Sequence, residues 1–257
     1  MTNNELKYLS NLKRKKYREK EKKFLIEGSH LVEEILRSPA RKELLSVFIR
    51  SGYDDTAVLQ LLKAENVPVE KMDAVSFAKI SDTENPQGII GLVNIPGRIR
   101  NSKSIGSLCI ALDNINDPGN LGTILRTCYW FNTDEILISS NSVELYNPKV
   151  IRASQGAVFN LNIYEGARLD EELQKRHKEG WNIFLTDLDA KSFLSKTTFE
   201  KKSKYVFVFG NEANGISPGI LASKDYQRIK IRSFSSCESL NIAISLGIVL
   251  NEFRTRA

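Results

Sequence analysis

The sequence predicts an α/β protein built of two domains. Short apolar runs alternate with segments of helical periodicity along most of the chain, the pattern of strands that alternate with helices. The chain has 257 residues, which is more than one small core needs. A polar stretch, RIRNSKSIG, follows Pro96 and Gly97. We therefore expect a boundary near Arg100 between an N-terminal domain, 1–99, and a C-terminal domain, 100–257.

In the N-terminal domain the sequence predicts three strands separated by two helices. Ser29 is a suitable N-cap for the first helix, whose apolar residues recur on one face, and Pro39 ends it. Pro96 ends the last strand. In chain order, these strands and helices are expected at 24–28, 29–38, 44–50, 56–66 and 87–96.

The C-terminal domain begins with an apolar strand and ends in a long helix. Its apolar strands alternate with helices, which is typical of a parallel sheet. Ligands of such sheets bind at the carboxyl ends of the strands. The expected strands are 107–115, 135–140, 181–188, 204–210 and 227–232, and the expected helices are 120–131, 148–159, 169–180, 217–222 and 240–253.

Positive charge is concentrated at the N-terminus. Residues 1–23 hold nine Lys or Arg and three Glu, a net charge of +6 that equals the net charge of the whole chain. Such a segment is expected to contact the phosphate backbone of a nucleic acid. A solvated amphipathic helix or a flexible tail is the alternative. The candidate RNA contacts in this segment are Lys13, Arg14, Lys15, Lys16 and Arg18.

Several classes of protein are excluded by the composition. The longest apolar stretch, 242–250, is far shorter than the roughly 20 residues of a membrane-spanning helix, and the basic N-terminal segment lacks the apolar core of a secretory signal. The three cysteines, Cys109, Cys128 and Cys237, form no C-x-x-C pair. We therefore expect reduced thiols in a cytoplasmic protein that does not contact membranes.

No metal site is expected. The chain has only two histidines, His30 and His177, both in charged helical segments. Asp187 and Asp189 form a pair of carboxylates at the end of a predicted strand, but we do not expect them to hold a metal ion. The usual signatures of dinucleotide-binding proteins, P-loop NTPases, esterases and zinc proteases are also missing.

Three loops that follow predicted strands are rich in Asn, Gly and Glu or Asp. In DPGNLGTILRT, Asn120 and Arg126 lie near a helix start, where backbone amides favour an anion that a guanidinium can also hold. In FVFGNEANG, Gly210 lets the backbone approach a ligand, and Glu212 needs a partner so close to a buried strand. In SCESLN, Ser239 caps the last helix. Each loop taken alone also fits a purely structural role as a helix cap or a strand-to-helix turn.

Together and in this order, the loops resemble the three motifs of the SpoU (TrmH-like) RNA 2′-O-ribose methyltransferases of the SPOUT superfamily. NPKVIRASQGAVF resembles the segment that follows the first motif, and FLIEGSHLVEEIL and NPQGIIGLV resemble the family's N-terminal substrate-binding domain. The resemblance thus covers nearly the whole chain. The matching residues are Asn120 and Arg126, then Lys149, Arg152, Ser154 and Gly156, then Gly210, Asn211, Glu212 and Gly215, and finally Ser239, Leu240 and Asn241.

The resemblance implies a knotted parallel-sheet (SPOUT) domain that binds S-adenosylmethionine, and a smaller N-terminal α/β domain of ribosomal-protein-like type that binds RNA. It also implies an obligate homodimer whose active site takes residues from both subunits, with ribosomal RNA expected ahead of transfer RNA as the substrate. The chain departs from the family at Arg232, Ser233 and Ser235, where Pro, Met and Gly are frequent. The implied catalytic residues are Asn120, Arg126, Glu212, Ser239 and Asn241, the implied cofactor contacts are Thr186, Leu188, Gly210, Asn211, Gly215, Ile231 and Leu240, and Arg152 joins the RNA contacts.

Methyl transfer from a sulfonium to a ribose hydroxyl is an in-line displacement, which positioning and removal of the hydroxyl proton accelerate. The resemblance implies Arg126 as a catalytic residue. Because a guanidinium rarely loses its proton in a protein, we expect Arg126 to hold a phosphate and stabilise the developing alkoxide. Two alternatives stay open, a catalytically inactive RNA-binding or ribosome-assembly protein of the same fold and an unrelated α/β enzyme with a nucleotide cofactor.

Overall fold

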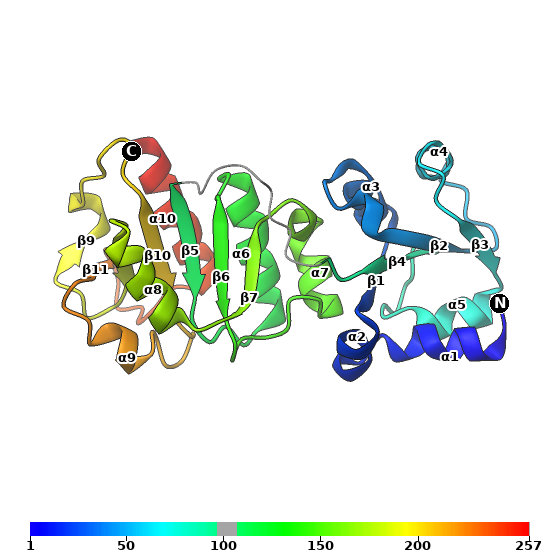
Figure 1. Ribbon diagram of the computed structural model, residues 1–257, viewed down its shortest axis with the longest axis horizontal. Helices are drawn as coiled ribbons and strands as arrows, with labels where there is room; N and C mark the ends of the chain where they lie inside the picture. Colours follow the sequence, from blue (N-terminus) through cyan, green and yellow to red (C-terminus); the bar gives the residue numbers. More distant parts are fainter. Residues whose placement is uncertain (97–106, 257) are drawn as a thin grey trace. The chain divides into compact units, whose positions relative to one another are not determined.

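The computed structural model describes residues 1–96 and 107–256, drawn as a ribbon in Figure 1. The boundary expected near Arg100 lies outside the described residues. The chain is α/β, as the sequence predicts, with one sheet in each of two compact units. Among the described residues, no helix has the length and apolar character that crossing a membrane requires.

The two compact units interleave along the chain. Unit 1 comprises Met1–Gly97 together with Glu144–Asn160, and unit 2 comprises Arg98–Val143 together with Leu161–Ala257. The segment 144–160, which the sequence pattern assigns to the C-terminal domain, therefore packs with the N-terminal part of the chain.

Unit 1 is built on a four-stranded sheet and the helices that connect its strands. Their bounds are β1 (Lys23–Glu27), α3 (Ser29–Arg37), β2 (Leu44–Arg50), α4 (Thr56–Ala64), β3 (Val69–Met72), α5 (Ala74–Ile80) and β4 (Ile89–Asn94). The strand order is β1-β4-β2-β3, antiparallel except between β2 and β3. The sequence pattern does not predict β3 and α5, because β3 is an edge strand in which only Met72 is buried and which therefore shows no apolar run.

The basic N-terminal segment folds as two helices of unit 1, α1 (Asn3–Asn11) and α2 (Lys15–Glu21). Leu6, Leu9 and Leu12 are buried and join the core that α5 forms on one face of the sheet, while α3 and α4 lie on the other face (Figure 1). A capping box between Thr2 and Glu5 starts α1. The segment is thus a packed part of unit 1, which excludes the flexible tail.

The segment that returns to unit 1 does not form the single helix expected at 148–159. It contains α7 (Pro148–Ser154), then Gln155 and Gly156 in the left-handed conformation, then a turn of 3-10 helix at Ala157–Phe159. A Cβ on Gly156 would lie 2.5 Å from the Cβ of Glu34. Only glycine fits there, whereas the helix itself ends at Gln155, which caps α7 in the left-handed conformation.

Unit 2 contains a seven-stranded parallel sheet, as the strand–helix alternation predicts. Its strands are β5 (Leu108–Leu112), β6 (Glu135–Ser139), β7 (Ile163–Ala167), β8 (Asn182–Thr186), β9 (Ser192–Phe193), β10 (Tyr205–Phe209) and β11 (Gln227–Lys230), and its helices are α6 (Pro118–Trp130), α8 (Leu169–Lys178), α9 (Pro218–Leu221) and α10 (Ile242–Arg256). The order is β7-β6-β5-β10-β8-β11-β9, with every pair parallel. The edge strands β7 and β9 are not predicted from the sequence, because neither has an apolar run.

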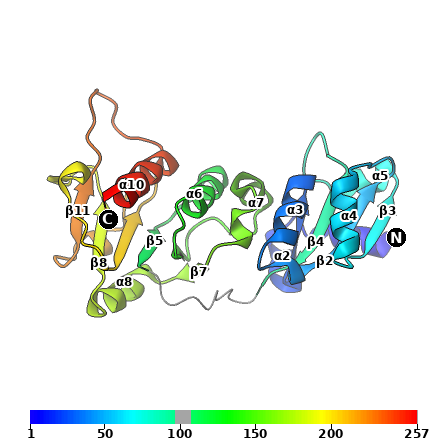
Figure 2. The same cartoon turned by 90° about the horizontal axis from the view of Figure 1, so that it is seen from above.

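Helices cover both faces of the unit 2 sheet. The helices α6 and α10 contact each other on one face, and α8 lies on the other (Figure 2). Side chains of α8 and α9, including Leu173 and Ile220, pack on Val206 and Val208 of the central strand β10. This layering leaves the carboxyl ends of β5, β8, β10 and β11 open to the loops that follow them.

Candidate functional site

The three loops singled out by the sequence meet in unit 2 at the side chain of Asn120. The Nδ2 of Asn120 donates a 2.8 Å hydrogen bond to Oε1 of Glu212, and the Nδ2 of Asn241 donates a 2.8 Å hydrogen bond to Oδ1 of Asn120. These partners lie 92 and 121 residues from Asn120 in the sequence. The chain therefore forms one polar cluster, which we call the Asn120 cluster, from Asn120, Glu212 and Asn241.

Helix capping fixes the position of Asn120. The helix α6 begins at Pro118, two residues earlier than expected, and the carboxylate of Asp117 caps it by accepting a 2.7 Å hydrogen bond from the backbone N–H of Asn120. Asn120 consequently lies in the first turn of the helix. Its side chain projects where the loops after β10 and β11 can reach it.

The cap of the last helix is Asn241, not Ser239 as expected. The Oδ1 of Asn241 accepts a 2.9 Å hydrogen bond from the backbone N–H of Ala243, at the start of α10. Its Nδ2 is left to bond Asn120. One side chain thus caps α10 and joins it to α6, while the Ser239 carbonyl accepts a hydrogen bond from the thiol of Cys237.

The loop after β10 closes on itself through glycine. A Cβ on Gly210 would lie 2.2 Å from the backbone carbon of Gly215 and from the nitrogen of Ile216, so no other residue fits. Asn211 and Gly215 exchange two backbone hydrogen bonds of 2.9 Å, and Gly215 has a φ of +68°. Gly210 is therefore required by the loop itself, in addition to any ligand that the loop approaches.

A buried carboxylate that sequence reasoning missed supports this loop. Asp113, 3% exposed at the end of β5, accepts hydrogen bonds from the backbone N–H of Ser217 at 2.7 Å and from Nδ2 of Asn114 at 2.9 Å. The carbonyl of Asn114 in turn accepts a 2.8 Å bond from Nδ2 of Asn211. A carboxylate that directly follows a fully buried strand was the available signal.

Arg126 does not join the Asn120 cluster. On an α-helix, a residue six positions later lies about 9 Å further along the axis and about 120° around it. The Arg126 side chain is exposed, and the described residues offer its guanidinium no hydrogen-bond or ion-pair partner. One turn further on, Trp130 is 83% exposed on the same stripe of α6.

The candidate cofactor contacts lie at the carboxyl ends of β8 and β11. The hydroxyl of Thr186, at the end of β8, donates a 2.8 Å hydrogen bond to the carbonyl of Val208 and so joins β8 to β10. Leu188 is 64% exposed and Leu240 is 47% exposed, whereas Ile231, directly after β11, is half-buried. These apolar side chains are available to a ligand at the same sheet edge as the Asn120 cluster.

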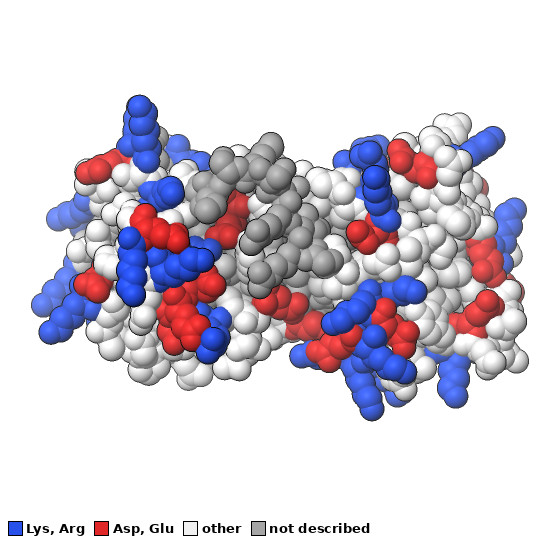
Figure 3. Space-filling view, in the orientation of Figure 1, with Lys and Arg blue, Asp and Glu red and all other residues white. Residues whose placement is uncertain are grey.

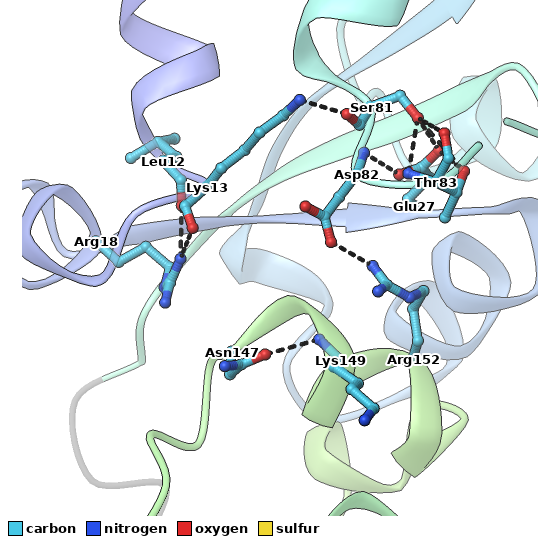
Figure 4. Close-up of polar contacts among 10 residues, drawn as sticks. All are labelled: Leu12, Lys13, Arg18, Glu27, Ser81, Asp82, Thr83, Asn147, Lys149 and Arg152. Atoms are coloured by element: carbon cyan, nitrogen blue, oxygen red, sulfur yellow. Dashed lines mark hydrogen bonds and ion pairs between the residues drawn. The ribbon is translucent and has the colours of Figure 1, made fainter. Parts of the chain in front are cut away.

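The candidate RNA contacts of unit 1 divide into exposed and engaged side chains. Arg14, Lys15 and Lys16, which we call the basic ridge, are exposed at the start of α2. Lys and Arg side chains lie among Asp and Glu in that part of the surface (Figure 3). Arg18 is 2% exposed, so it cannot touch RNA as expected, and Lys13 donates to the carbonyl of Ser81 (Figure 4).

The remaining candidate in unit 1 is Arg152, on α7. Its guanidinium forms a 2.8 Å ion pair with Asp82 and is about one third exposed (Figure 4). In unit 2, the carboxylate of Asp187 forms an ion pair with Arg228. The part of the chain that the structure describes holds no group of three potential metal ligands.

Comparison with known proteins gives matches for both parts of the chain. Residues 107–251 match the SpoU rRNA Methylase family, and residues 3–91 match the MRM3-like substrate binding domain. The 23S rRNA (guanosine(2553)-2′-O)-methyltransferase RlmP of Bacillus subtilis is 27% identical over 98% of this chain and 96% of its own length.

Solved structures share the fold. A protein described as an RNA methyltransferase of the TrmH family, from Porphyromonas gingivalis, matches with a TM-score of 0.84 and 27% identity over 100% of this chain and 99% of that one. An AdoMet-bound rRNA methyltransferase from Sinorhizobium meliloti matches with a TM-score of 0.82 and 24% identity over 99% and 95% of the two chains.

Proposed function

This chain belongs to the SpoU rRNA methylase family, and we propose that it transfers the methyl group of S-adenosylmethionine to a ribose 2′-hydroxyl of ribosomal RNA. Membership of this family makes the chain an RNA methyltransferase. The name of its Bacillus subtilis relative gives ribosomal RNA as the substrate of that enzyme. The observation that carries the proposal is the hydrogen-bonded meeting of all three motifs at Asn120.

The residues at the sheet edge fit S-adenosylmethionine. Leu188 and Leu240 expose apolar surface there, and the Gly210 loop is held in place by its own backbone bonds. Apolar walls with a few fixed polar groups are typical of cofactor pockets. Leu188, Ile231 and Leu240 would pack on the adenosyl group, and the loops at Thr186 and at 210–215 would bind its polar groups.

When bound, the cofactor supplies an electrophilic methyl group on a sulfonium. The chain's own task is to hold the ribose hydroxyl in line and to stabilise it as it loses its proton. Asn120, fixed on both sides by Glu212 and Asn241, would hold the two loops at a constant spacing. Arg126 would hold the phosphate next to the target ribose and stabilise the alkoxide, since its guanidinium keeps its proton.

We further propose that the active unit is a homodimer formed through α6 and α10. Both helices expose large apolar side chains on the surface that carries Arg126, with Trp130 at 83%, Ile244 at 56% and Ile248 at 38% exposure. A second copy that covers this surface would bury them and would bring the partner subunit's Arg126 toward the Asn120 cluster. This explains why Arg126 has no partner among the described residues of its own chain.

We also propose that unit 2 contains the family's knot and that the protein is cytoplasmic. The insertion of β10 between β5 and β8, with α10 packed on α6, supports the knot. Free buried thiols at Cys109 and Cys128 and a ribosomal substrate support the cytoplasm.

The test uses purified protein, labelled S-adenosylmethionine, and ribosomal RNA transcribed without modifications. The proposal expects label in the RNA at one nucleotide that resists alkaline cleavage, because a 2′-O-methyl group blocks the attack on the phosphate. RNA binding with neither methyl transfer nor cofactor binding would support the inactive RNA-binding alternative. Mapping 2′-O-methyl sites in cells with and without the gene identifies the nucleotide.

A further inference from the structure

The loop between β11 and α10, residues 231–241, presents an aromatic ring to solvent. Phe234 is 91% exposed, the highest value of any large apolar side chain in the described part of the chain. Single exposed apolar residues are common on protein surfaces, so the exposure alone does not indicate a function. The position of this ring within the loop does indicate a function.

Both ends of the loop are fixed next to the candidate site. At its start, the guanidinium carbon of Arg232 lies 4.7 Å from the centre of the Phe193 ring on β9, a cation–π contact. At its end, Asn241 bonds Asn120. Phe234 is seven residues from Asn241, which limits its distance from the cluster to about 25 Å even for a fully extended chain.

Side chains of the loop itself hold its tip. The hydroxyl of Ser233 donates a 2.9 Å hydrogen bond to the carbonyl of Ser235, and the hydroxyl of Ser235 accepts a 3.2 Å bond from the backbone N–H of Cys237. Phe234 lies between these two serines, so their hydrogen bonds hold the backbone from which the exposed ring projects. Two of the three departures from the family, Ser233 and Ser235, thus build the support of this ring.

From this geometry we propose that Phe234 stacks on an unpaired base of the RNA substrate beside the methylated nucleotide, and so contributes to the choice of that nucleotide. The inference rests on the proposed function. Proteins that recognise particular RNA sites read single-stranded bases by stacking them on aromatic side chains, because a base pair in a helix hides its face. A solvent-exposed ring on a hydrogen-bonded loop within reach of the Asn120 cluster meets that requirement.

The test compares four variants with the unchanged protein on in vitro transcribed, unmodified ribosomal RNA. Phe234→Ala and Phe234→Leu are expected to raise the RNA KM about tenfold or more, because both remove the ring. Phe234→Tyr keeps the ring and is expected to stay within about threefold of the unchanged protein. Val75→Ala, at a residue 69% exposed on α5 of unit 1, is the control for loss of an exposed apolar side chain and is expected to have no effect.

Cofactor affinity, measured by calorimetry, and mass, measured by light scattering, are expected to be unchanged in all four variants. The stacking proposal would be overturned if Phe234→Ala had the same RNA KM as the unchanged protein. It would also be overturned if Phe234→Leu, which has no ring, had that same KM. A cofactor Kd raised by Phe234→Ala would assign the ring to the cofactor pocket instead, and a lower mass would assign it to the subunit interface. If the unchanged protein transfers no methyl group, the proposed function fails first, and the two failures are distinguishable.

Discussion

The Nε of Arg18 donates a 2.8 Å hydrogen bond to Oε1 of Glu144, a residue 126 positions later in the chain. The two side chains are 3% and 9% exposed, and the same guanidinium donates to the carbonyls of Leu12 and Lys13 at 2.9 and 2.7 Å. One arginine of the basic segment therefore joins α1 and α2 to the segment that returns to unit 1 ahead of α7.

Removing one partner of this pair is expected to destabilise unit 1. Glu144→Gln leaves the buried guanidinium without a counter-ion, which costs about 3 kcal/mol or more in the free energy of unfolding. Glu19→Gln breaks an exposed pair with Lys15, at 3.7 Å, and is the control, with a change below about 0.5 kcal/mol.

Urea denaturation can follow the two units separately. Both tryptophans, Trp130 and Trp181, lie in unit 2, so their fluorescence reports that unit and far-UV circular dichroism reports both. We expect Glu144→Gln to shift the circular dichroism transition to lower urea more than the fluorescence transition. Equal stability of the Glu144 and Glu19 variants would show that the ion pair is not a structural support.

The Asn120 cluster predicts that the shape of Glu212 matters more than its charge. Glu212→Gln keeps an oxygen that can accept from Nδ2 of Asn120, so kcat is expected to fall less than about fivefold. Glu212→Ala leaves that amide without its partner and is expected to lower kcat about 100-fold. Single-turnover methyl transfer measures both. Equal losses in the two variants would instead place the carboxylate charge in the chemical step.

The three thiols are expected to differ in reactivity. Burial raises the pKa of the Cys109 thiol well above its ordinary value and raises that of Cys128 to about 12. Because the thiolate is the nucleophile, a thiol of that pKa has only about one part in 10⁴ in the reactive form at pH 8. A maleimide should therefore label the folded protein once, at the exposed Cys237, and label it three times in denaturant.

Mass spectrometry of the labelled peptides checks this, with the Cys237→Ser variant as the control that takes no label when folded. Cys237 lies in the loop 231–241, beside the candidate cofactor contact Leu240. Saturating S-adenosylmethionine is therefore expected to slow its labelling several-fold. Early labelling of Cys109 or Cys128 would show that the unit 2 core opens in the native protein.

The dimer proposal predicts that two inactive variants complement each other. If Arg126 acts on the partner's site, a mixed dimer of Arg126→Ala and Asn120→Ala subunits keeps one intact site. Random assembly should then give about a quarter of the unchanged activity, whereas each variant alone has less than about 1%. Co-expression with two affinity tags isolates the mixed dimer. If the mixed dimer is as inactive as its parents, Arg126 and Asn120 act within one subunit.

Local pattern predicted the sheet of unit 2 and placed the candidate loops after its strands. Val206 and Val208 lie in an uninterrupted apolar run, and parallel strands bring the loops at Asn120 and Glu212 to one edge. The partner of Arg18 could not be predicted in this way, because a charge run looks the same whether its cations face water or a carboxylate 126 residues away. The partners of Asp113 and the steric need for Gly210 are likewise set by contacts that only the folded chain creates.

We expect the basic ridge on α2 to supply RNA affinity and no chemistry. Arg14 and Lys16 are exposed and form no ion pair among the described residues, so the variant Arg14→Gln with Lys16→Gln should fold normally. Removing one cation that binds a phosphate is expected to reduce the slope of log affinity against log salt by about 0.7 to 0.9. The double variant should therefore bind ribosomal RNA more weakly at low salt, with a slope flatter by up to about 1.8, and bind S-adenosylmethionine with unchanged affinity.

Lys175→Gln with Lys178→Gln, two exposed lysines on α8 of unit 2, is the matched control for the change in net charge. A deletion of residues 1–23 cannot make this test, because it also removes Leu6, Leu9 and Leu12 from the core of unit 1. If the α2 variant and the α8 control give the same slope, the ridge contributes only its net charge, and the RNA path lies elsewhere on the surface.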